Sequence, residues 1–78
     1  MRKTNTEIES EVVKELLYKP LEIVRNGWIY NANGNFTKDF VLKIIRNKTL
    51  EAKNGGTGKV PFYRIRGEDI IKYIKKYQ

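Results

Sequence analysis

The chain of 78 residues contains no cysteine and no histidine. Without cysteine it can form neither a disulfide framework nor a thiolate metal site, and without histidine it lacks the commonest metal ligand and general base. None of its glycine-rich stretches has the Lys-Ser/Thr ending of a phosphate-binding loop followed by a helix. We therefore expect no metal, no cofactor, no small-molecule substrate and no enzymatic activity.

Long apolar runs are also missing from the sequence. It has no run of 18 apolar residues, and its N-terminal stretch MRKTNTEIESEVVKELL lacks the apolar centre of a signal peptide. Neither export nor membrane insertion is expected, and a cytoplasmic location follows by default. A chain this short buries roughly 60% of the surface that it exposes when unfolded, so it can build one domain with a modest core.

Positive charge is abundant and unevenly distributed. The chain has 16 Lys and Arg against 9 Asp and Glu, a net charge of +7. Residues 1–26 hold five basic and five acidic side chains, so the whole excess lies in residues 27–78. A basic excess confined to one part of a small domain points to a polyanion, most often nucleic acid. The alternative is a lysine-rich surface that serves solubility alone.

The N-terminal segment predicts a helix over residues 6–18. Its apolar residues recur at helical spacing: Ile8, Val12, Leu16 and Leu17. Glutamates come early in this segment and lysines late, as the helix dipole favours. This helix is a candidate for contacts between protomers, and the alternative is that it completes the core.

Two structures are possible for the segment after Pro20. The favoured one is a short helix, PLEIVRN, that starts with the proline and has Gly27 as its C-terminal cap. In the other, Asn26-Gly27 forms the turn of a hairpin between apolar runs. Nearby aromatic residues are expected in the core rather than stacked on bases: Trp28, Tyr30 and Phe36.

A turn is predicted at residues 31–35, because the sequence NANGN there favours positive backbone angles. A third helix is predicted from Thr37, which is a good N-cap residue, with Arg46 in the last turn. Three of its side chains are expected to face the core: Val41, Ile44 and Ile45.

Residues 49–53 and 59–66 read as extended, with the glycine-rich turn NGGTG between them. Pro61 is expected to confine the second strand to a sheet edge, which suits a two-stranded wing. A last helix is predicted from about Glu68. Its apolar side would hold Ile70, Ile71 and Ile74, with Tyr73 or Tyr77.

This order of elements, in an α+β fold, is that of a small winged helix-turn-helix. Residues 37–76 resemble the DNA-binding domain of the small phage and transposon excisionases and the related MerR-type regulators. The matching elements are a recognition helix Thr37–Asn47, a short strand Leu50–Ala52, a wing Gly55–Lys59, a strand Tyr63–Arg66 and a closing helix from Glu68. Where the family pattern often has a glycine before the short strand, this chain has Lys48-Thr49. The expected organisation is an N-terminal helix at 1–19 and a winged helix-turn-helix at 20–78, in one compact unit.

The resemblance implies a sequence-specific protein that binds double-stranded DNA and has no catalytic activity. It would act as a recombination directionality factor, as excisionases do, or as a small transcriptional regulator. Self-association on repeated DNA sites is expected, because a single module of this size buries only about 600–1,000 Å² on DNA. The alternative function is a basic adaptor that binds RNA or an acidic protein.

The candidate DNA-binding residues come from two elements. On the recognition helix they are Lys38, Leu42, Lys43, Arg46 and Asn47, which can reach base edges in the major groove, with Lys38 at the helix start able to hold a phosphate. On the wing they are Lys53, Asn54, Lys59, Arg64 and Arg66. The alternatives are a solvated charged stripe on the helix, and strand charges that keep a sheet edge from aggregating.

Overall fold

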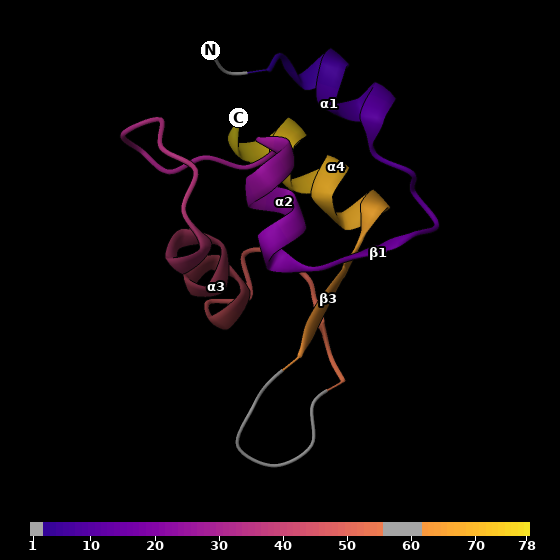
Figure 1. Cartoon of the computed structure of the whole chain (residues 1–78), viewed down its shortest axis with the longest axis vertical. Coiled ribbons are helices and arrows are strands. Elements are labelled where there is room, and N and C mark those ends of the chain that lie inside the picture. Colours follow the sequence, from indigo (N-terminus) through magenta and orange to yellow (C-terminus); the bar gives the residue numbers. More distant parts are fainter. Residues whose placement is uncertain (1–2, 56–61) are drawn as a thin grey trace.

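The computed structural model describes residues 3–55 and 62–78, and this part of the chain folds as four helices and three strands (Figure 1). In chain order they are α1 (Asn5–Glu11), β1 (Leu17–Tyr18), α2 (Pro20–Asn26), α3 (Lys38–Arg46), β2 (Lys53–Asn54), β3 (Tyr63–Arg66) and α4 (Gly67–Tyr77). The strands form one antiparallel sheet in the order β1-β3-β2. The predicted α+β class is confirmed.

The helices surround a single core of isoleucines and other apolar residues. α1 packs on α4, and α2 packs on both α3 and β3. In Figure 1 α1 lies at one end of the molecule, and β2 and β3 extend from the other end with α3 beside them. The fully buried side chains are Ile8, Ile23, Ile29, Val41, Leu50, Ile65, Ile70 and Ile74. Every helix and the central strand contribute to this list, so the core holds all of these elements together.

The first helix is shorter than predicted. Thr4 caps its start, because the Thr4 hydroxyl accepts a hydrogen bond from the Glu7 N–H at 3.2 Å and the Glu7 carboxylate accepts one from the Thr4 N–H at 3.4 Å. The helix ends at Glu11, and the prediction that it continues to residue 18 is wrong. Ile8 and Val12 are buried as expected, but Leu16 is 51% exposed and Leu17 48%.

Pairing across the sheet explains where α1 stops. Leu17 and Tyr18 form β1, in register with Arg66 and Ile65 of β3. The Tyr18 hydroxyl also accepts a hydrogen bond from the N–H of Val13 at 3.0 Å, which holds the segment between α1 and β1 in place. A continuous helix would forfeit all of these bonds, so tertiary contacts override the helical spacing of the sequence.

The second helix forms as favoured, and the hairpin alternative is wrong. Pro20 occupies its first turn, and Glu22 accepts a hydrogen bond from the Lys19 N–H at 3.1 Å. Gly27 ends the helix with φ of 69°, a left-handed conformation that glycine adopts without strain. Its N–H donates back to the carbonyl of Val24 at 3.1 Å.

The segment between α2 and α3 is well anchored. Trp28 is buried, with its ring edge-on to that of Tyr18 at a centroid distance of 4.9 Å. The predicted turn at 31–35 is confirmed, because the Asn31 side-chain oxygen accepts hydrogen bonds from the N–H groups of Asn33 and Asn35, both at 2.9 Å. Tyr30 and Phe36 are only half-buried, so the expectation that they belong to the core holds fully for Trp28 alone.

The third helix agrees with its prediction. Thr37 is the N-cap and accepts a hydrogen bond from the Phe40 N–H at 3.3 Å. Its core-facing residues are the three predicted: Val41, Ile44 and Ile45. Just past its end, Lys48 adopts a φ of 62°, and it is the one non-glycine residue with positive φ in the described ranges 3–55 and 62–78.

The strand predictions are right for β3 and need correction elsewhere. β3 spans Tyr63–Arg66 as expected, but it is the central strand of the sheet rather than an edge strand, because β1 pairs along one side of it and β2 along the other. Pro61 and Lys59 lie outside the described residues. Leu50–Ala52 is not a strand, since Leu50 is held by its N–H bond to the Ile44 carbonyl at 3.1 Å.

The closing helix α4 starts one residue earlier than predicted, at Gly67. Ile70, Ile71 and Ile74 are buried together with Tyr73, whereas Tyr77 is exposed. α4 is also the longest helix of residues 3–55 and 62–78, at 11 residues. Within those ranges no helix has the length and apolar character needed to cross a bilayer.

Candidate nucleic-acid interface

The exposed face of α3 borders a groove. Lys38, Leu42 and Arg46, spaced four residues apart on the helix, line it from one side. Lys19, Pro20 and Leu21 at the start of α2, together with Phe62, Tyr63 and Arg64 at the base of β3, complete its lining. The groove has a volume of about 450 Å³. Three elements that are distant in the sequence therefore meet at one surface, which we call the α3 groove.

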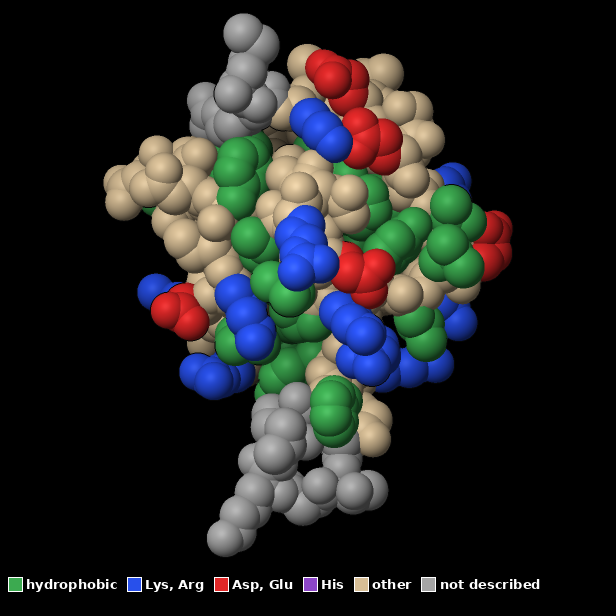
Figure 2. Space-filling view, in the orientation of Figure 1, with side chains coloured by type: hydrophobic (Ala, Val, Ile, Leu, Met, Phe, Trp, Pro, Cys, Tyr) green, Lys and Arg blue, Asp and Glu red, His purple; other side chains and the backbone are tan. Residues whose placement is uncertain are grey.

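The α3 groove combines an apolar floor with a cationic rim. Leu21 and Phe62, which are 43% and 54% exposed, give the floor with Leu42. The rim is formed by the four cations of the lining: Lys19, Lys38, Arg46 and Arg64. Figure 2 shows basic side chains gathered around an apolar surface in the lower half of the view, over α3 and the base of the β2–β3 pair.

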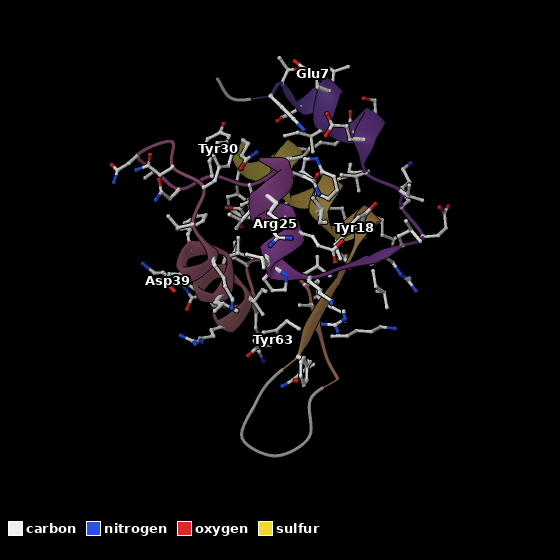
Figure 3. The ribbon with its side chains drawn as sticks, in the orientation of Figure 1. Glu7, Tyr18, Arg25, Tyr30, Asp39 and Tyr63 are labelled. Carbon is white, nitrogen blue, oxygen red and sulfur yellow. The ribbon has the colours of Figure 1, made fainter. Side chains whose placement is uncertain are left out.

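Acidic side chains stay outside the α3 groove. Of the described residues that line it, none is Asp or Glu. Asp39 follows Lys38 in the first turn of α3 but lies on the outer side of the helix, away from Tyr63 at the base of β3 (Figure 3). Four cations without a neighbouring carboxylate in the lining give the groove a positive potential that favours anionic ligands.

Comparisons of the chain with protein-family models, curated proteins and solved structures find no match. What the α3 groove offers chemically is anion binding on its rim together with apolar contact on its floor.

The α3 groove brings together four of the predicted binding residues and leaves out two others on the same helix. Lys43 on α3 and Asn47 just after the end of α3 are exposed but do not line the groove. Asn47 is the C-cap residue of α3, and its N–H donates to the carbonyl of Lys43 at 3.0 Å. Lys43 comes four residues after Asp39 and therefore lies on the outer side of α3 with it, not on the side that lines the groove.

The predicted residues on the strands have mixed surroundings. Lys53, Arg64 and Arg66 line a smaller hollow of about 110 Å³ that also contains Glu51 and Asp69. Arg64 borders both hollows, and its guanidinium lies 5.7 Å from the centre of the Phe62 ring. Because β3 is central, the alternative that its arginines guard a sheet edge is wrong.

Arg66 faces acidic neighbours instead of the α3 groove. Its guanidinium is 3.7 Å from the Glu68 carboxylate, in an exposed ion pair. Partial burial raises the pKa of the nearby Asp69 carboxyl, and Lys72 opposes the rise while Glu68 adds to it. Arg66 is therefore less available to an external anion than Arg64 is.

Two further predicted residues add little to this geometry. Asn54 is exposed on β2, opposite Tyr63 in the sheet register. Lys59 lies outside the described residues. Both stay predictions.

Five residues of the α3 groove were missed from the sequence: Lys19, Pro20, Leu21, Phe62 and Tyr63. Lys19 is the N-cap residue of α2, and Leu21 lies in its first turn. No local signal in the sequence indicates that these two residues meet α3 and β3 at one surface. Phe62 falls within the extended segment predicted at 59–66, where nothing in the sequence marks it as part of a binding surface. Only its 54% exposure in the folded chain identifies it as part of a surface.

Proposed function

We propose that this chain is a sequence-specific protein that binds double-stranded DNA through a winged helix-turn-helix. α2 and α3 would be the two helices of that unit, and the β2–β3 pair would be its wing. In the cell it would act as an excisionase-like recombination directionality factor or as a small transcriptional regulator. The observation that carries the proposal is the α3 groove, with cations contributed by α2, α3 and β3.

The topology supports this proposal. From β1 onward the order is strand, helix, helix, strand, strand, helix, and β3 pairs with both β1 and β2. This arrangement is compatible with a winged helix, because it presents α3 and the β2–β3 pair at the same end of the molecule (Figure 1). A helix and a strand pair that project together can contact a duplex at two adjacent places.

Each part of the α3 groove has a role in this mode of binding. The major groove of B-DNA admits an α-helix whose side chains reach base edges, a position that suits Leu42 and Arg46. Phosphate contacts set the position of a protein on the duplex, a role that suits Lys19 and Arg64 on the flanking elements. Lys38 lies in the first turn of α3, where exposed backbone N–H groups also favour a phosphate.

Self-association on repeated DNA sites remains part of the proposal, but α1 is a poor candidate for the contact between protomers. Its apolar residue Ile8 is fully buried, and Val12 at its C-cap is 6% exposed. Both belong to the same core as α4. Contacts between copies would therefore use another surface.

Salt-dependent binding tests the proposed function. The affinity for duplex DNA would be measured over a range of salt concentrations for the parent, for a Lys38→Ala/Arg46→Ala variant and for a Lys14→Ala/Lys76→Ala variant of equal charge. Each lost phosphate contact lowers the slope of log affinity against log salt by about 0.9. We expect the α3 variant to lose affinity and slope, and the control, whose lysines lie outside the α3 groove, to keep most of both.

Two results would contradict the proposal. The first is a flat salt response of the parent on duplex DNA. The second is tighter binding to single-stranded RNA or to an acidic protein than to any duplex, which would favour the adaptor function instead. If both double variants lost the same affinity and the same slope, only the net charge of the protein would matter for binding. The α3 groove would then not be the DNA-binding surface.

A further inference from the structure

Leu42 is an apolar residue in a cationic row. Lys38 lies one turn before it on α3 and Arg46 one turn after it, and all three line the α3 groove. Leu42 itself is half-buried, so part of its side chain is open to solvent. Leu21 and Phe62 border the same floor and are more exposed. The centre of the proposed DNA-reading surface is therefore apolar.

An interface made only of phosphate and polar base contacts would not use such a floor. Among the base edges in the major groove, thymine alone carries an apolar group, the methyl on C5. Covering a leucine side chain with a methyl group removes apolar surface from water and is favourable in proportion to the area covered. A bidentate arginine contact, in contrast, suits the two acceptors of guanine.

We infer that Leu42, with Leu21 and Phe62 beside it, binds the 5-methyl group of a thymine in the target duplex. This inference rests on the proposed function, and it names the chemical group of the DNA that the centre of the α3 groove recognises. Residues four apart on a helix are about 6 Å apart along its axis, which is close to two base-pair steps. Arg46 then reads a guanine about two base pairs from that thymine.

The test removes single methyl groups from the DNA. A preferred duplex is first selected from random sequence with the parent protein, and each thymine in it is then replaced in turn by deoxyuridine, which lacks only the 5-methyl group. For the parent we expect one thymine position, or two adjacent ones, to lose affinity by about four-fold, the equivalent of one buried methyl group. Deoxyuridine at other positions has no effect.

Variants of the protein then assign the effect to Leu42. In Leu42→Ala the sensitive position should bind thymine and deoxyuridine equally, whereas Leu42→Met, which keeps the volume, should retain the difference. Leu17→Ala is the matched control, because Leu17 is 48% exposed on β1 and does not line the α3 groove. It should behave as the parent does. Cooperative thermal unfolding of each variant shows that it is folded.

The outcomes separate this inference from the proposed function. If the parent protein shows no preference for duplex DNA, the proposed function itself is overturned. Selective duplex binding with no deoxyuridine-sensitive position, or a selected site without thymine, overturns the inference alone. A sensitive position that persists unchanged in Leu42→Ala shows that another residue contacts the methyl group, and the assignment to Leu42 is then wrong.

Discussion

A Cβ atom placed on Gly67 would lie 2.1 Å from the carbonyl oxygen of Val13. The backbone between α1 and β1 fits directly against the start of α4, and two hydrogen bonds fix it there. The Gly67 N–H donates to the Leu16 carbonyl at 2.9 Å, and the Glu68 N–H donates to the Lys14 carbonyl at 3.2 Å. Glycine at position 67 is what allows this close approach.

Gly67→Ala should therefore destabilise the fold. The methyl group meets backbone atoms, which cannot rotate away, so we expect a loss of at least about 1–3 kcal/mol in the free energy of unfolding, measured by urea denaturation. Gly55→Ala is the control, because the nearest atom to its Cβ would be the Phe62 carbonyl oxygen at 3.9 Å, an ordinary contact. Equal stability of the two variants would contradict the packing of Val13 on Gly67.

Removing residues 1–19 should abolish cooperative unfolding of the remaining fragment. The deletion takes away Ile8 and Val12 from the core and also β1, so that β3 loses one of its two neighbours. Ile8→Ala in the full chain isolates the packing part and should cost about 2–5 kcal/mol. Circular dichroism during heating tests both. A fragment 20–78 that unfolds cooperatively near the parent's midpoint would show that the N-terminal segment is dispensable.

Lys48→Gly should stabilise the protein by about 0.5–1 kcal/mol. Lys48 is held at φ 62°, where a side chain costs about 1 kcal/mol or more and glycine is unstrained. Part of the gain is offset because glycine is more flexible when unfolded. Asn47→Gly provides the control of opposite sign, since Asn47 has a φ of −80° and gains nothing from glycine. Chemical denaturation should show a higher free energy of unfolding than the parent's for Lys48→Gly and a lower one for Asn47→Gly.

The position of Lys48 also illustrates what the sequence can predict. The pattern that the sequence resembles often has a glycine at this point, and here a lysine adopts the left-handed conformation that glycine favours. α2, α3 and α4 could be predicted because their signals are local: Pro20 and Gly27 bound α2, and Thr37 caps α3. Signals of this kind depend only on residues a few positions apart, so they do not change with the tertiary contacts that the chain makes.

The failures have a common cause, which is pairing between distant residues. The helix predicted over 6–18 stops at Glu11 because Leu17 and Tyr18 pair with β3, almost fifty residues later in the chain. The same pairing makes β3 central rather than an edge strand. The α3 groove depends on it too, since Phe62 and Leu21 reach one surface only after folding. No periodicity within a single element contains this information.

The stability of the α1 end should depend on pH through Glu11. A hydrogen bond from Lys3, and a second from the Trp28 indole N–H at 3.0 Å, hold the pKa of the Glu11 carboxyl below its ordinary value of 4.5. A carboxyl whose pKa is lowered by folding stabilises the protein above its unfolded pKa. This contribution is lost as the pH falls through the lowered value.

Denaturation at neutral pH and below pH 4.5 should therefore show a smaller loss of stability in Glu11→Gln than in the parent. Glu15→Gln removes a charge from the exposed segment between α1 and β1 and should follow the parent. Trp28 is the single tryptophan, and its indole N–H donates to the Glu11 carboxylate, so its fluorescence should change as Glu11 is protonated. Identical pH profiles for the parent and Glu11→Gln would contradict the role of this carboxylate.

The last prediction distinguishes the reading helix from the flanking strand. Arg46 borders the centre of the α3 groove, where a bidentate contact to a base discriminates by about 1–3 kcal/mol, so Arg46→Ala should flatten the sequence preference. Arg64 lies at the base of the β2–β3 pair over Phe62, where it suits a phosphate. Arg64→Ala should weaken binding to all duplexes alike and lower the salt slope by about one unit.

Arg66 provides the matched control on the same strand. It is paired with Glu68 and lies outside the α3 groove, so Arg66→Ala should change neither the selected sequence nor the salt slope. Selection of sites from random duplex, run for the three variants at one salt concentration, gives the sequence preference, and titrations at several concentrations give the slope. A loss of consensus in Arg64→Ala with none in Arg46→Ala would reverse the two roles. Equal effects of Arg64→Ala and Arg66→Ala would mean that β3 contributes charge without a defined contact, and that the residues of α3 alone set how the duplex is held.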